Sequence, residues 1–139
     1  MRTIDPSVKL ALEFNDAVKD LADKAASKGN VTMMGYKQQL YIVAKASPLQ
    51  LIENSAKDIW KYRRVILAIH EDDTYNWDLV SQFKSSYKAN GEQSIIDLIY
   101  DIFRAADEAE KICVYENVLN ILSIVKKYRD LSKAMKSSQ

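Results

Sequence analysis

The residues best suited to acid–base or metal chemistry are few in this chain, and their number limits what it could catalyse. The chain holds one histidine, His70, and one cysteine, Cys113. A structural zinc site needs about four Cys or His ligands, and a di-iron bundle needs paired Glu-x-x-His motifs, so we expect no metal centre and no cofactor. Gly29, Gly35 and Gly91 are isolated in the sequence, which excludes a glycine-rich phosphate-binding loop.

His70 ends a string in which Arg63 and Arg64 come first, and Arg63 and His70 would share one apolar stripe of a helix about 10 Å apart. The string resembles the Arg-x4-6-His motif of the HEPN superfamily, whose members are small helical bundles, commonly dimeric and often metal-independent ribonucleases. The resemblance covers only residues 63–70. It implies His70 as acid–base catalyst and Arg63 or Arg64 as the stabiliser of the phosphorane, converging across a dimer. We favour the structural alternative, a histidine at the negative end of a helix and an arginine that is salt-bridged or reaches solvent.

A second group of residues is suited to binding an anionic polymer. Basic and aromatic side chains alternate in two strings, KDIWKYRR and KKYR. Lysine and arginine neutralise phosphates, and exposed aromatic rings stack on bases. Helical periodicity predicts that the rings are buried, which opposes stacking. The candidate nucleic-acid-binding residues are Lys57, Trp60, Lys61, Arg64, Lys126, Lys127 and Arg129.

The elements that must position these residues are helices, because three glycines and two prolines are too few for the turns of a strand-rich chain. Asp5-Pro6 and Ser47-Pro48 each combine a capping residue with a proline, which is typical of a helix start. We predict a single all-α domain over residues 1–139, a bundle of five or six helices with a basic tail from about residue 126. The apolar spacing predicts the first four helices over about residues 6–28, 32–46, 48–70 and 75–89.

Residues 92–139 contain neither glycine nor proline. One continuous helix of about 45 residues would be about 68 Å long, whereas a compact domain of this size is about 37 Å across. The apolar stripe also changes face, so we predict a break between Ala106 and Lys111. The helix beyond it is apolar over more than half of its circumference, which is typical of a central helix or of a subunit interface. We expect a homodimer or larger assembly through Val118, Ile121, Leu122, Val125 and Tyr128.

The formal net charge of +1 is a cancellation of charged blocks. Residues 31–70 and 124–139 each carry a net charge of +4, residues 71–123 carry −7, and residues 1–30 are neutral. The acidic block could neighbour the basic ones within a monomer or a dimer, which is the interpretation that we favour. In the other interpretation, a basic surface binds an anionic partner.

These observations predict a non-enzymatic interaction or assembly protein that acts through protein–protein contacts as a homo-oligomer. The first alternative is a small nucleic-acid-binding helical protein, and the second is the ribonuclease described above. The partner would be an acidic protein or a nucleic acid and not a membrane, because the apolar runs are shorter than the ~18 residues of a membrane span. Cys113 lies between Ile112 and Val114, so we expect a buried, reduced thiol in a cytoplasmic protein.

Overall fold

The computed structural model describes residues 6–26, 42, 45–86 and 95–137. Within these residues the chain forms six helices and one two-stranded sheet, which confirms the predicted all-α bundle with a long final helix. The helix predicted for residues 32–46 lies outside the described residues, apart from residues 42, 45 and 46. In chain order the elements are α1 (Pro6–Ala26), α3 (Gln50–Lys61), α4 (Arg63–Ala68), β1 (His70–Glu71), β2 (Thr74–Tyr75), the 3₁₀ helix η1 (Trp77–Ser86), α5 (Ile95–Ala105) and α6 (Glu108–Ser137).

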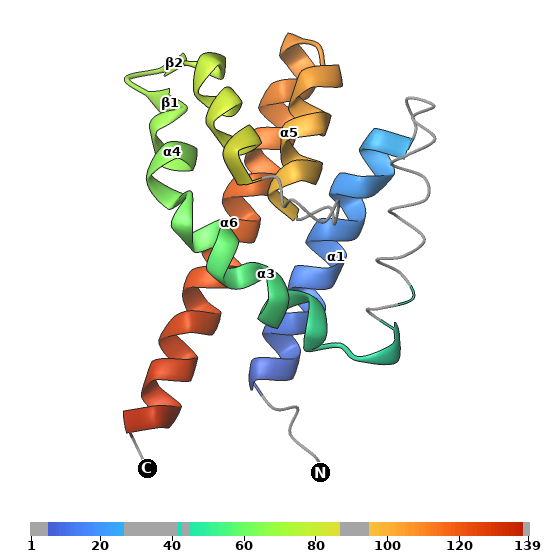
Figure 1. Ribbon diagram of the computed structural model, residues 1–139, viewed down its shortest axis with the longest axis vertical. Helices are drawn as coiled ribbons and strands as arrows, with labels where there is room; N and C mark the ends of the chain where they lie inside the picture. Colours follow the sequence, from blue (N-terminus) through green and yellow to red (C-terminus); the bar gives the residue numbers. More distant parts are fainter. Residues whose placement is uncertain (1–5, 27–41, 43–44, 87–94, 138–139) are drawn as a thin grey trace.

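The longest helix, α6, is the axis on which the other helices pack. Its 30 residues span about 45 Å at 1.5 Å per residue. Helix α1 packs against α6, and α3 contacts α1, α5 and α6, while η1 lies beside α5 at the end of the bundle where α6 begins (Figure 1). One core joins these elements, and its fully buried side chains include Phe14, Ile59, Phe83, Phe103 and Ile121.

The single helix predicted for residues 48–70 is wrong, because the chain turns at Tyr62 and forms two helices, α3 and α4. Tyr62 has φ −96° and ψ 11°, and its backbone N–H donates to the carbonyl of Ile59, three residues back, instead of continuing the α-helical pattern. The turn directs the Tyr62 ring into the core, where it packs edge-to-face on Phe83 at 5.6 Å between ring centres. Arg63 therefore begins a new helix and does not continue the apolar stripe of α3.

A short β-hairpin, β1–β2, follows α4 and was not predicted. His70 pairs with Tyr75 and Glu71 with Thr74, in an antiparallel register. The two residues of the turn, Asp72 and Asp73, have φ of 51° and 61°. Two consecutive residues in the left-handed region match the turn geometry that tight hairpins favour, and aspartate tolerates that region better than most residues do. His70 consequently lies on a strand and is exposed.

The breaks and caps of the C-terminal half agree with the sequence prediction more closely. Helix α5 ends at Ala105 and α6 begins at Glu108, so the predicted break between Ala106 and Lys111 is confirmed. The Asp107 carboxylate accepts a hydrogen bond from the backbone N–H of Glu110 at 2.9 Å, which caps α6. The helix predicted from residue 75 is present as η1. It is a 3₁₀ helix that begins at Trp77, and the Asn76 side chain accepts from the backbone N–H of Asp78 there.

Tyr115 ties α6 to α4, and its removal should lower stability in a pH-dependent way. Its buried hydroxyl donates to the carbonyl of Ile66 at 2.6 Å. Burial raises the pKa of Tyr115 above its usual value of 10.0, and the backbone N–H of His70 offsets part of that rise. We expect Tyr115→Phe to lower the free energy of unfolding by about 1–2 kcal/mol at neutral pH.

The pH dependence of that difference follows from the sign of the shift. A raised pKa in the folded state means that the hydroxyl contributes fully below the unfolded pKa, and that this contribution is lost as the pH rises through the folded pKa. The difference between wild type and Tyr115→Phe should therefore be constant from pH ~7 to ~9 and shrink above pH ~10. Urea unfolding at each pH measures it. A difference that grows above pH ~10 would contradict this account.

Candidate functional site

The clearest site among the predicted residues is a cluster of two arginines on one tryptophan ring. The guanidinium carbon of Arg63 lies 4.7 Å from the centre of the Trp60 ring, and that of Arg129 lies 5.0 Å from the same centre. Arg63 also donates from Nη1 to the Trp60 carbonyl at 2.9 Å. The ring thus brings together a residue from the start of α4 and one from the last third of α6, 66 positions apart in the sequence. We call these three residues the Trp60 cluster.

The fold positions this cluster at the contact between α3 and α6. Ile59 is buried in the core, which leaves Trp60 half-buried at the edge of the helix, facing α6. The turn at Tyr62 then allows Arg63 to reach back over the ring. The Nε of Arg129 is buried and has no hydrogen-bond partner among the described residues. Cation–π contacts of this kind contribute about 0.5–2 kcal/mol each, which is enough to restrict long arginine side chains to one region.

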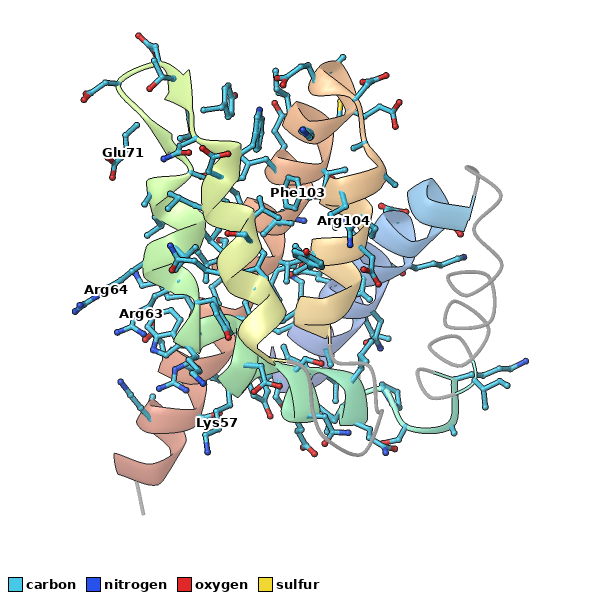
Figure 2. The ribbon with its side chains drawn as sticks, turned by 45° about the horizontal axis from the view of Figure 1, so that its top comes forward. Lys57, Arg63, Arg64, Glu71, Phe103 and Arg104 are labelled. Carbon is cyan, nitrogen blue, oxygen red and sulfur yellow. The ribbon has the colours of Figure 1, made fainter. Side chains whose placement is uncertain are left out.

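Exposed cations flank the Trp60 cluster in the sequence, on α3, α4 and α6. Figure 2 shows Lys57, Arg63 and Arg64 on the same side of the molecule. Residues 57–64 and 126–133 each contain four basic residues and one acidic residue, Asp58 and Asp130 respectively. The surface that we call the basic surface consists of the Trp60 cluster and the exposed side chains of Lys57, Lys61, Arg64, Lys126 and Lys127.

Two runs of exposed acidic residues lie at the end of the molecule opposite to the basic surface. Glu71, Asp72 and Asp73 are exposed on the hairpin, and Asp107 and Glu108 are exposed where α6 begins. Figure 1 shows the hairpin at the end of the molecule opposite to the end of α6. Residues at the start of α6 are about 30 Å from Arg129 along the helix, because each residue adds 1.5 Å. This distance is about three Debye lengths at 0.1 M salt. Within one chain, these acidic groups therefore do not pair with the cations around Arg129, and pairing across a dimer stays a prediction.

The aromatic residues of the basic strings are not available for stacking on bases. Tyr62 is buried in the core, and both arginines of the Trp60 cluster cover the half-buried ring of Trp60. Tyr128 is half-buried as well, and burial, with the nearby carboxylate of Glu53, raises the pKa of its hydroxyl. Of the rings that helical periodicity predicted to be buried, Tyr62 is buried, and Trp60 and Tyr128 are half-buried. The surface offers guanidinium and ammonium groups to a ligand, and not open aromatic faces.

The Arg–His pair of the ribonuclease hypothesis does not come together within one chain. Arg63 is held at the Trp60 cluster, and Arg64 is exposed on α4. His70 lies beyond the end of α4 and stacks on Tyr75, with ring centres 4.3 Å apart. The prediction that Arg63 and His70 share one stripe of a long helix was wrong. Helix α4 begins at Arg63, after the turn at Tyr62, and ends at Ala68, before His70 enters the hairpin.

Four of the five side chains predicted to form a subunit interface belong to the core of a single chain. Val118, Ile121, Leu122 and Val125 are 0–7% exposed, and Tyr128 is half-buried. Helix α6 contacts α1, α3, α4 and α5 of the same chain, and these four side chains lie in the core that they share. Assembly through these four side chains is therefore excluded without unfolding, and the homo-oligomer itself stays a prediction.

Sequence reasoning missed an aromatic cluster at the acidic end of the molecule. Tyr75 stacks on Trp77 at 4.8 Å, and both rings meet Tyr115 edge-on. The rings come from two separate parts of the chain, and only the string Tyr75-Asn76-Trp77 marked the place in the sequence. Cys113, expected to be buried, is exposed, because Val114 and Tyr115 take the core positions of that turn of α6.

The described residues contain no group of three or more His, Cys, Asp or Glu side chains that could hold a metal ion. None of the helices in the described part of the chain is both long and apolar enough to cross a bilayer. Comparison of the chain with protein-family models, with curated proteins and with solved structures finds no match. The site must therefore be interpreted from its own geometry.

Proposed function

We propose that this chain is a non-enzymatic nucleic-acid-binding protein that holds the phosphate backbone on its basic surface. The observation that carries the proposal is the Trp60 cluster, in which one ring holds two guanidinium groups from distant parts of the chain. Because both distances are measured to one ring centre, the two charges are no farther apart than the two distances added together. Two like charges within about one Debye length of each other repel, and a bound phosphate reduces that repulsion.

The chemistry of the basic surface favours phosphate over bases. A guanidinium presents a planar set of N–H donors that matches phosphate oxygens, and ring contacts reduce the freedom that binding would otherwise remove. The arginines cover the ring of Trp60, so no stacking platform is left for a base. Binding should therefore be insensitive to sequence and dominated by charge.

A nucleic acid fits this surface better than an acidic protein does. The centres of protein–protein interfaces are depleted in charged residues, whereas nucleic-acid interfaces are much more positively charged. The basic surface has seven cationic residues, and of its aromatic neighbours Tyr62 is buried and Trp60 is covered. The free, exposed thiol of Cys113 fits a reducing compartment, which supports a cytoplasmic location.

The test is the salt dependence of binding to a fluorescein-labelled single-stranded RNA, followed by anisotropy. Each neutralised phosphate of a single strand contributes about 0.7 to the slope of log affinity against log salt. With seven basic residues on the surface we expect a slope of about −3 to −5 between ~50 and ~200 mM salt. An abasic strand of the same length should bind within about twofold of the intact strand, because no base is stacked.

Three outcomes would overturn the proposal. The first is an affinity that does not change with salt, and the second is a loss of more than about tenfold on removing the bases. The third is polyglutamate that binds as tightly as the RNA at equal charge, which would point to an acidic protein as the partner.

Self-association is a separate proposal that we retain from the sequence, and it requires a surface outside the core of α6. Sedimentation velocity at micromolar concentration tests it directly. A monomer at all concentrations would reject it without affecting the nucleic-acid proposal, because the Trp60 cluster is complete within one chain.

A further inference from the structure

An open pocket of about 490 Å³ lies between η1, α5 and the start of α6, away from the basic surface. Its volume is within the range of about 300–1,000 Å³ that is typical of small-molecule sites. Three aromatic side chains form its walls: Trp77 from η1 and Tyr100 and Phe103 from α5. The Phe103 ring is buried and lies 5.7 Å from the Trp77 ring, so the apolar part of the pocket is continuous with the core.

The Trp77 ring is fixed in place by its neighbours. Tyr75 stacks on it at an interplanar angle of 13°, and the indole N–H donates to the Glu108 carboxylate at 3.1 Å. A ring held on one face and at its polar edge is a preformed wall, because no further ordering is needed when a ligand packs against it. The same hydrogen bond occupies the Glu108 carboxylate, which therefore acts as a support for the wall.

Two cations stand at the rim of the pocket, each beside a different aromatic wall. The Arg104 guanidinium carbon lies 5.6 Å from the Tyr100 ring centre, and the Lys111 ammonium nitrogen lies 6.0 Å from the Trp77 ring centre. Arg104 is exposed, and Figure 2 shows it beside Phe103 on α5. Among the lining residues that the structure describes, Arg104 and Lys111 stand against one acidic residue, Asp78, which gives this part of the lining a net positive charge.

We propose that this pocket binds a small planar organic anion, a single aromatic or heteroaromatic ring system that carries one carboxylate or similar group. The aromatic walls bind the ring of the ligand by stacking and edge contacts, and Arg104 and Lys111 bind its negative group at the rim. The pocket shares no residue with the basic surface, so the inference is independent of the proposed function.

The chain has two tryptophans, which makes the test residue-specific. In a ¹H–¹⁵N spectrum the indole N–H groups of Trp60 and Trp77 give two resolved signals, and Trp60→Phe assigns them. Indole-3-acetate, an anion, is compared with tryptophol, which is neutral, and with tryptamine, a cation of matched size. We expect the Trp77 signal to shift with indole-3-acetate and the Trp60 signal to stay in place. Tryptophol should bind about fivefold more weakly and tryptamine more weakly still.

Single substitutions then test which side chains bind the charged group of the ligand and which bind its ring. Arg104→Gln and Lys111→Gln should each weaken indole-3-acetate about fivefold and leave tryptophol unchanged. Ser81→Phe, which adds a ring at the edge of the pocket, should weaken both ligands, and Lys9→Gln on α1 should change neither. Two results with the wild-type protein would each overturn the proposal without any variant. One is a Trp77 signal that does not shift, and the other is tryptamine binding as tightly as indole-3-acetate. An unchanged affinity for indole-3-acetate in both Arg104→Gln and Lys111→Gln would show that these two cations do not bind the carboxylate.

Discussion

Replacing Arg63 and Arg129 together by glutamine should weaken the binding of single-stranded RNA about 30-fold at ~50 mM salt. Each substitution removes a charge-assisted hydrogen bond to phosphate, and a bond of that kind contributes about 1–1.5 kcal/mol in a solvent-exposed site. The two residues occupy one cluster, so the strand loses two neighbouring phosphate contacts at once. The slope of log affinity against log salt should become shallower by about 1.4, because two phosphate contacts are lost.

A charge-matched control separates this local effect from the general loss of two cations. Lys9→Gln with Lys45→Gln removes the same total charge from exposed positions outside the basic surface, and it should change the affinity by less than about threefold. Trp60→Leu keeps every cation but removes the ring that positions them. It should lower the affinity about fivefold with the slope unchanged, because the number of phosphate contacts is the same. Equal losses in the arginine pair and the lysine pair would show that the cluster has no special part in binding.

Phe83→Ala should lower the free energy of unfolding by about 3–5 kcal/mol, a large part of the ~5–15 kcal/mol that holds a domain of this kind together. Phe83 is fully buried and is the residue of η1 against which Tyr62 packs. A 3₁₀ helix has poorer hydrogen-bond geometry than an α-helix, so η1 relies on its buried side chains, Phe83 and Val80, for its attachment to the bundle. The truncation leaves a cavity at the point where α3, α4 and η1 meet.

Leu67→Ala is the matched control, since Leu67 is a large apolar residue on the neighbouring helix α4 that is 55% exposed. We expect a change of about 0.5 kcal/mol or less for this variant. Urea unfolding followed by circular dichroism measures both variants. A loss below about 1 kcal/mol for Phe83→Ala would mean that the Tyr62 turn is held by other contacts, and the account of the break in the 48–70 region would have to change.

The helices with strong end signals were predictable from the sequence, and the interruptions without such signals were not. Pro6 and the apolar stripe through Phe14 and Val18 predict α1, and the change of face near residue 106 predicts the end of α5. Nothing in the local sequence at Tyr62 distinguishes a turn from helix interior, because the turn is imposed by a packing partner, Phe83, from a distant segment.

The candidate site was predictable in composition but not in arrangement. The residue types of the basic surface were identified from two short strings, yet the meeting of Trp60 and Arg129 depends on how α3 crosses α6. Four of the five predicted interface side chains were misplaced for a related reason: they are buried in the core of the same chain, where α1, α3, α4 and α5 contact α6. The pocket at Trp77 could not be predicted from the sequence, because its lining residues come from η1, α5 and α6 and no sequence motif connects them.

The length of α6 has a consequence for how the protein meets its partner. With acidic groups at the hairpin and the start of this helix, and cations near its end, these exposed charges of the described residues form an electric dipole along α6. A nearly neutral chain is not pulled toward a polyanion as a whole, but the field exerts a torque that turns the basic end forward before contact. Encounter is then selective for orientation, and raising the salt concentration should slow association as well as weaken the complex.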